Sequence, residues 1–137
     1  MGRIVAIDYG TKRVGIAVTD PMRIIASPLD TVHSTELVPF LEKYVSEEEI
    51  DVLVIGLPKR LNNTDSHITQ LIRELTVSMT RKFPQLKIEN VDEPFTSKIA
   101  FNAMIDGGLK KKQRQNKETI DKLSATVILQ SYMEQQL

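Results

Sequence analysis

The stretch Arg3-Ile-Val-Ala-Ile-Asp-Tyr-Gly-Thr-Lys-Arg-Val-Gly-Ile-Ala-Val-Thr19 decides the fold of this chain. Its first seven residues are a short apolar run typical of a buried strand, and residues 14–19 form a second such run. The polar residues between the two runs suit the turn of a hairpin. Residues 24–29 predict a third strand, which is expected at an edge because a proline lies within it. Three short strands joined by brief turns predict an antiparallel meander.

Beyond the meander, apolar residues recur at helical spacing, and Ser34 or Thr35 can cap the first helix. Helices are expected at residues 37–45, 68–79 and 96–105 and from Asn116 to about residue 133, with two further strands at 51–56 and 86–93. Because helical crossovers make the later strands parallel, the predicted fold is one α/β domain over residues 1–137. Its mixed five-stranded sheet, with helices on both faces, matches the ribonuclease H-like architecture.

Composition excludes several classes of protein. With 41% hydrophobic and 26% charged residues, the 137-residue chain fits an ordinary globular protein. Disulfides, thiolate metal sites and a cysteine nucleophile are excluded because the sequence has no cysteine. No apolar run approaches the roughly 18 residues of a membrane span. We expect no signal peptide, because the first residues run straight into a strand-like segment. We therefore expect a cytoplasmic protein with no membrane partner.

The charges cancel overall but are unevenly distributed. The chain has 18 basic and 18 acidic residues, and five of the cations lie within residues 110–117, where there is no acid. These five are Lys110, Lys111, Lys112, Arg114 and Lys117. A basic segment on an acidic body can bind a polyanion locally, and a solvated loop explains the same run with about equal weight.

Asp8 is the first candidate for chemistry. It shares parity with Ile4 and Ala6, so its side chain points to a face that is otherwise buried. An isolated carboxylate there costs several kcal/mol and is expected to be paired, protonated or bound to a cation. Lys12 and Arg13 follow in the same turn and could contact phosphates. Taken alone, an aspartate that caps its own turn explains Asp8 equally well.

Further acids occur where they could converge on Asp8. Asp92 and Glu93 end the fifth strand at the carboxyl edge of the sheet, where open α/β sheets bind ligands. Only one of these two can face the site, because adjacent strand residues point to opposite faces. Asp121 lies one turn into the last helix, and the small residues that follow on its face would let the helix approach the sheet. Favourable placement near a helix N-terminus is the alternative for Asp121.

Together these acids predict a triad of carboxylates. Oxygen ligands suit Mg²⁺ or Mn²⁺ rather than zinc, and His33 and His67 are too far apart to form a local zinc motif and are expected at the surface. Such a cluster supports two-metal hydrolysis of a phosphodiester. Three tyrosines and four phenylalanines offer little for base stacking, so contacts to the nucleic-acid backbone and shape should dominate.

Four blocks of the sequence resemble the signatures of the YqgF/RuvX family, and the similarity spans essentially the whole chain. The blocks are residues 8–20 (DYGTKRVGIAVTD), 56–58 (GLP), 91–93 (VDE) and 121–125 (DKLSA). That family is similar in fold to the RuvC Holliday-junction resolvases. It is assigned as a nuclease that matures the 5′ end of pre-16S ribosomal RNA, and junction resolution is the older proposal. The resemblance implies that Asp8, Glu93 and Asp121 are the catalytic, metal-binding acids, and so favours Glu93 over Asp92.

The main expectation is therefore a hydrolase, a metal-dependent endonuclease acting on pre-16S ribosomal RNA in ribosome biogenesis. We expect ribosome-assembly factors among its partners and a monomer or weak homodimer. Three alternatives remain. Cleavage of a Holliday junction in branched DNA is one. ATP binding through the hairpin at residues 8–11 is another, although enzymes with that loop clamp ATP between two domains. A non-catalytic nucleic-acid-binding module is favoured by Pro94, which stands where the family usually has arginine.

Overall fold

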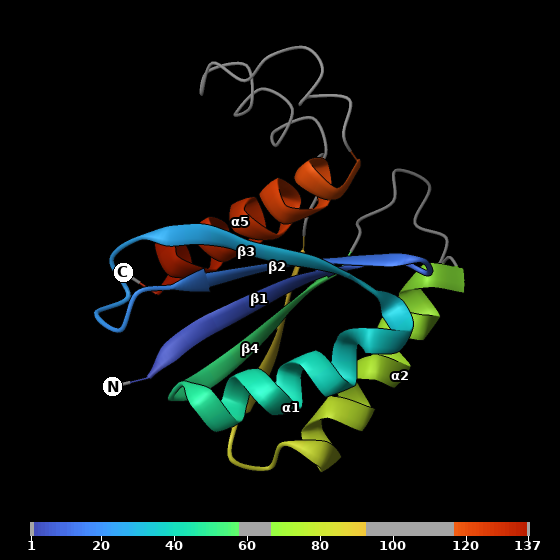
Figure 1. Cartoon of the computed structure of the whole chain (residues 1–137), viewed down its shortest axis with the longest axis horizontal. Helices are drawn as coiled ribbons and strands as arrows, with labels where there is room; N and C mark the ends of the chain where they lie inside the picture. Colours follow the sequence, from blue (N-terminus) through green and yellow to red (C-terminus); the bar gives the residue numbers. More distant parts are fainter. Residues whose placement is uncertain (1, 58–66, 93–116, 137) are drawn as a thin grey trace.

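The computed structural model of this chain describes residues 2–57, 67–92 and 117–136, and in them a five-stranded sheet lies between helices (Figure 1). The strands are β1 (Arg3–Tyr9), β2 (Arg13–Thr19), β3 (Ala26–His33), β4 (Ile50–Leu57) and β5 (Lys87–Asp92). The helices are α1 (Leu37–Glu47), α2 (His67–Lys82) and α5 (Lys117–Gln135), with a short 3-10 turn, η1 (Ser34–Glu36), before α1.

The sheet has the predicted mixed topology. Its strand order is β3-β2-β1-β4-β5, so the third strand is at an edge as predicted. β1, β2 and β3 pair antiparallel, and β4 and β5 continue the sheet in parallel with β1. The predicted helix at 96–105, like the last residue of the strand predicted at 86–93, lies outside the described residues.

Strand β1 contributes side chains to two hydrophobic cores, because successive residues point to opposite faces of the sheet. Val5 and Ile7 point to the face covered by α1 and α2, and Ile4 and Ala6 point to the face covered by α5 (Figure 1). All four side chains are almost completely buried. Since residues two apart share a face, Asp8 is placed on the α5 side of the sheet, as its parity predicted.

The third strand begins later than the sequence pattern predicted. The Asp20 carboxylate accepts hydrogen bonds from the backbone N–H groups of Met22, Ile24 and Ile25, at 2.7–3.2 Å. These bonds close a turn that takes both isoleucines out of the strand and leaves Ile24 70% exposed. The prediction of a strand from residue 24 was wrong because apolar character alone does not reveal the side-chain bonds of this turn.

The predicted helix caps, Ser34 and Thr35, are also wrong. Helix α1 follows Glu36, whose side chain makes no cap hydrogen bond, and His33 caps the preceding turn η1, its Nδ1 accepting from the backbone N–H of Thr35 at 3.2 Å. Ser34 is used elsewhere: its hydroxyl donates to the carbonyl of Thr11 at 2.7 Å and its N–H to the carbonyl of Lys12 at 2.9 Å. Two hydrogen bonds therefore fix the turn between β1 and β2 against η1.

Candidate active site

Helix α5 lies unusually close to the sheet beside Asp8. Asp8 is directly opposite Gly15 on β2, and residues opposite each other in an antiparallel pair point to the same face. That face is covered by α5, and a Cβ atom on Gly15 would overlap the backbone carbonyl of Asp121. The glycine therefore admits the helix backbone and brings Asp121 next to Asp8.

Small residues on α5 continue this close contact. Ser124 and Ala125 are buried, with 2% and 0% of their surfaces exposed, as their size predicted. Gly15 itself was missed by the sequence analysis. The signal was present, since a glycine inside a strand often marks the close approach of another backbone.

The two acids interact electrostatically. Asp8 is half-buried, and burial together with repulsion from the Asp121 carboxylate raises the pKa of Asp8 to about 7. Burial is the larger cause. Two carboxylates in one poorly solvated place favour either a retained proton or a bound cation. The raised pKa is consistent with the expectation that the Asp8 carboxyl is protonated or bound to a cation.

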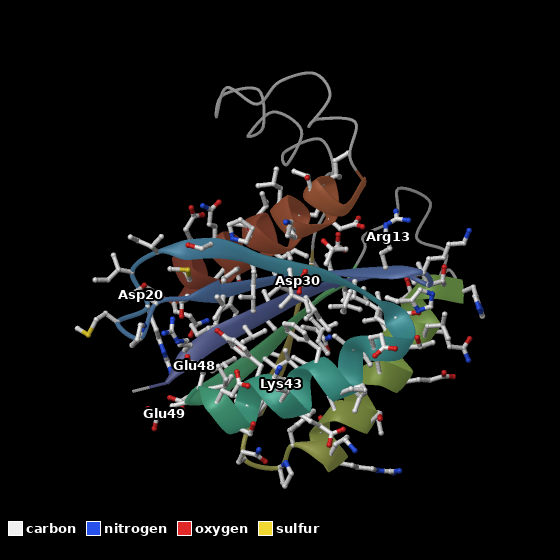
Figure 2. All side chains as sticks on the ribbon, in the orientation of Figure 1. Arg13, Asp20, Asp30, Lys43, Glu48 and Glu49 are labelled. Atoms are coloured by element: carbon white, nitrogen blue, oxygen red, sulfur yellow. The ribbon has the colours of Figure 1, made fainter. Side chains whose placement is uncertain are left out.

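Arg13 pairs with the second of these acids. Its Nε donates to Oδ2 of Asp121 at 2.8 Å, and the two side chains are 36% and 22% exposed. Figure 2 labels Arg13 near the end of the sheet where β1 and β2 meet, far from Asp20 at the other end. The neighbouring Lys12 is exposed in the turn. Arg13, predicted as a phosphate contact, thus has a carboxylate partner within the protein.

The remaining predicted site residues are only partly covered by the structure. Glu93, Pro94, Lys110, Lys111, Lys112 and Arg114 lie outside the described residues, as does the side chain of Lys117. Asp92 is exposed at the end of β5, and His33 and His67 are exposed as predicted. Among residues 2–57, 67–92 and 117–136, no three His, Cys, Asp or Glu side chains are grouped to hold a metal ion. The described part of the site is therefore the pair Asp8 and Asp121.

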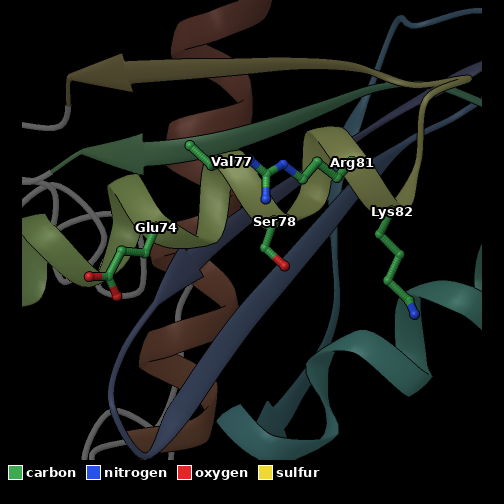
Figure 3. Close-up of a pocket in the computed structure, with 5 residues that line it drawn as sticks. All are labelled: Glu74, Val77, Ser78, Arg81 and Lys82. Carbon is green, nitrogen blue, oxygen red and sulfur yellow. The ribbon is translucent and has the colours of Figure 1, made fainter.

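A pocket elsewhere is separate from this pair. It has a volume of about 580 Å³, and the described residues that line it all belong to α2: Glu74, Val77, Ser78, Arg81 and Lys82 (Figure 3). Helix α2 covers the face of the sheet opposite α5 (Figure 1). The pocket therefore does not open onto Asp8.

With this geometry in place, comparison with known proteins gives the family. The RuvX family, described as Holliday junction resolvase, matches residues 2–135. The chain belongs to the RuvX family. This confirms the resemblance seen in the four sequence blocks.

Curated relatives of this RuvX chain are about half identical to it over nearly their full length. A protein of Flavobacterium psychrophilum is 51% identical, with 97% of both chains covered. One of Bacteroides fragilis is 51% identical over 98% of this chain and 97% of its own. One of Christiangramia forsetii is 50% identical over 97% of this chain and 98% of its own. All three are provisionally named pre-16S rRNA nucleases.

Two solved structures share the fold of the RuvX chain at low sequence identity. The Fowlpox virus resolvase, in complex with Holliday junction DNA, has a TM-score of 0.60 and 15% identity, with 98% of this chain and 99% of the resolvase covered. RuvC of T. thermophilus, also with a Holliday junction substrate, has a TM-score of 0.59 and 13% identity, with 99% and 96% covered. The predicted ribonuclease H-like fold is confirmed.

Family membership also confirms that the RuvX chain is an enzyme, a hydrolase of ester bonds. In the part of the chain that the structure describes, every helix is too short or too polar to cross a membrane.

Proposed function

We propose that this RuvX chain is a divalent-metal-dependent endonuclease that matures the 5′ end of pre-16S ribosomal RNA. One observation carries the proposal: the backbone of α5 is seated on Gly15, so that the Asp121 carboxylate and the half-buried Asp8 carboxylate converge. The substrate is argued from relatives about 50% identical that are provisionally named for this RNA.

The described residues fit a hard divalent cation. Asp8 and Asp121 offer only oxygen ligands, which suit Mg²⁺ or Mn²⁺, and their mutual repulsion is relieved by positive charge between them. We propose these two residues as ligands, with Glu93 as the third because the family resemblance implies it. When bound, such an ion activates water and stabilises the charge that develops on the phosphate oxygens.

The residues of the chain itself determine when a cation can bind. Because burial and, to a smaller extent, the Asp121 carboxylate raise the pKa of Asp8 to about 7, this carboxyl keeps much of its proton at neutral pH. A cation therefore competes with a proton at Asp8, and its affinity should increase with pH. The exposed Lys12 and the cations Lys110, Lys111, Lys112, Arg114 and Lys117 are proposed to bind phosphates of the RNA.

Cleavage of a four-way DNA junction is the second candidate. It is favoured by the fold shared with two resolvases that were solved with junction DNA, at TM-scores of 0.60 and 0.59. At 13–15% identity these resolvases share the fold of this chain, and a cleavage assay distinguishes the two substrates.

The test is a cleavage assay with purified protein in Mg²⁺ and in Mn²⁺, on a labelled pre-16S leader RNA and on a four-way DNA junction. The variants are Asp8→Asn and, as a matched control, Asp30→Asn on the edge strand β3, where the aspartate is exposed. We expect metal-dependent cleavage of the RNA by the wild type and the control and none by Asp8→Asn. Cleavage of the junction alone would support the second candidate. Binding of the RNA without cleavage by any variant would contradict the proposal and favour a binding module.

A further inference from the structure

We infer that Arg13 is a positioning residue, which holds the Asp121 carboxylate in the orientation that lets Asp8 and Asp121 share a divalent cation. The inference rests on the proposed function, and it assigns to Arg13 a role within the protein that a surface phosphate contact would not have.

The geometry places Arg13 on the correct face. Arg13 and Gly15 are two residues apart on β2 and so point to the same side, and Gly15 is directly opposite Asp8. The Arg13 side chain therefore lies diagonally across from Asp8, and its Nε donates to Oδ2 of Asp121 at 2.8 Å. This length is typical of a charge-assisted bond.

The hydrogen bond leaves Asp121 able to bind a cation. It uses only Oδ2, and an ionised carboxylate has lone pairs on both oxygens, so Oδ1 stays available. Carboxylates that bind metals are themselves commonly held by hydrogen bonds from neighbouring side chains. The bond from Arg13 is of this kind.

Arg13 is itself well anchored. It is the first residue of β2, and the turn before it is fixed by Ser34, which donates to the carbonyls of Thr11 at 2.7 Å and Lys12 at 2.9 Å. Within the described part of the chain, Asp121 is the one hydrogen-bond partner of the Arg13 guanidinium. The strand and the turn thus hold Arg13 where its guanidinium bonds to the Asp121 carboxylate.

The sign of one measurement separates positioning from simple charge neutralisation. A guanidinium that only compensated the two acids would repel an incoming cation, so removing it would tighten cation binding. A guanidinium that orients Asp121 has the opposite effect, since loss of such a supporting bond typically weakens metal affinity about 10–100-fold.

The experiment measures Mn²⁺ affinity by isothermal titration calorimetry, without nucleic acid. The variants are Arg13→Met, which keeps an unbranched stem and removes the guanidinium with its donors, and Arg13→Lys, which keeps the charge. The matched control is Arg81→Met, an exposed arginine of α2 on the opposite face of the sheet (Figure 3). We expect Arg13→Met to bind Mn²⁺ about 10–100-fold more weakly than the wild type. The Mn²⁺ affinity of Arg13→Lys should lie between those of the wild type and Arg13→Met, and the affinity of Arg81→Met should equal that of the wild type.

Several outcomes would overturn the inference. Unchanged or tighter Mn²⁺ binding by Arg13→Met would do so, provided that its melting temperature shows it to be folded. Should Arg13→Met not fold, Arg13→Lys decides, and an affinity equal to the wild type or tighter would refute positioning. Asp8→Asn separates this failure from that of the proposed function. If Asp8→Asn does not bind Mn²⁺ while Arg13→Met binds it normally, only the positioning role of Arg13 is refuted. If the wild type binds no Mn²⁺, both the role of Arg13 and the proposed metal-dependent function are refuted.

Discussion

The backbone carbonyl of Asp121 lies against the Cα atom of Gly15, so that helix α5 and strand β2 touch where any other residue would hold them apart. Gly15 is also the partner of Asp8 across the β1–β2 pair. A residue with no side chain therefore determines the distance between two acids that are far apart in the sequence.

Substituting Gly15 with alanine should displace α5 and weaken cation binding. The new methyl group would overlap backbone atoms, which cannot swing away as the end of a side chain can. Overpacking of this kind costs about 1–3 kcal/mol of unfolding free energy, which urea denaturation can measure. We expect Gly15→Ala to lose Mn²⁺ affinity as well, because the Asp121 carboxylate moves with the helix.

Gly2→Ala is the matched control for this substitution. A Cβ atom on Gly2 would meet Oδ1 of Asp51 at 2.6 Å and the Asp51 backbone nitrogen at 3.0 Å. The Asp51 carboxylate is held by 2.8 Å bonds from the Gly2 N–H and from Arg23, but as the end of a side chain it gives way more cheaply than the backbone carbonyl that faces Gly15. We expect a smaller loss of stability and normal Mn²⁺ binding. If Gly15→Ala were no less stable than Gly2→Ala, the close seating of α5 would be contradicted.

Asp8 should make the unfolding free energy depend on pH in a recognisable way. The pKa of Asp8 is raised from 3.8 to about 7 by burial and by Asp121, so between these values the folded chain holds a proton that the unfolded chain has lost. The stability contributed by this proton is complete below about pH 4 and is lost as pH rises through 7, by up to about 1.4 kcal/mol per pH unit.

Asp8→Asn removes this dependence, because asparagine stays neutral. The stability of the variant relative to the wild type should therefore increase from pH 5 to pH 7 and then level off, as measured by urea denaturation in the absence of divalent cations. Asp30→Asn, which removes an exposed carboxylate, is measured over the same range as the control. A stability difference that does not change with pH for Asp8→Asn would mean that the Asp8 carboxyl is not desolvated.

The elements of the fold were predictable because their signals are local. The apolar runs at 3–9 and 14–19 and the helical spacing of apolar residues each depend on the period of one element, and the parity of Asp8 followed from its strand. The start of β3 was not predictable in this way. It depends on three backbone N–H groups that bond to the Asp20 side chain, and no pattern of apolar residues records those bonds.

Candidate residues for the site could be selected from the sequence, but their arrangement could not. The sequence and the family resemblance selected Asp8 and Asp121, and the structure brings these two together. The pairing of Arg13 with Asp121 joins residues 108 positions apart, so spacing along the chain carried no sign of it. Arg13, expected to contact phosphates because it lies in the same turn as Lys12, pairs with Asp121 within the described residues.

A second polar contact, between the buried Tyr132 and the half-buried Glu89, holds the other end of α5. The Tyr132 hydroxyl donates to the Glu89 carboxylate on β5, which lowers the pKa of Glu89 and helps burial raise the pKa of Tyr132 to about 12. Tyr132→Phe should destabilise the protein by about 1–2 kcal/mol at pH 7, since a bond to a charged acceptor is lost. The effect should shrink as pH falls through the lowered pKa of Glu89, because the stability from an ionised Glu89 is present only above it.

Tyr44→Phe is the control for Tyr132→Phe in thermal unfolding. Tyr44 is half-buried on α1 and stacks on Phe40, with ring centroids 6.1 Å apart, a contact that phenylalanine preserves. We expect little change in its melting temperature. If both substitutions lowered the melting temperature equally, the hydrogen bond from the Tyr132 hydroxyl to Glu89 would contribute nothing specific to stability.

Asp121→Asn should lower the pKa of Asp8 only part of the way. Repulsion from the Asp121 carboxylate is the smaller cause of the raised pKa and burial is the larger, so the neutral amide removes only the smaller contribution. Titration of the Asp8 carboxyl carbon by NMR should give a pKa below about 7 and still above 3.8. The measurement is made without divalent cations.

The freed guanidinium of Arg13 complicates Asp121→Asn, because it can turn toward Asp8 and lower its pKa further. The double variant Arg13→Met with Asp121→Asn removes this cation and isolates the effect of burial. An ordinary pKa in the double variant would show that repulsion, rather than burial, sets the protonation of Asp8. An Asp8 pKa unchanged by Asp121→Asn would mean that the two carboxylates do not interact, and the convergence on which the proposed cation site rests would then be wrong.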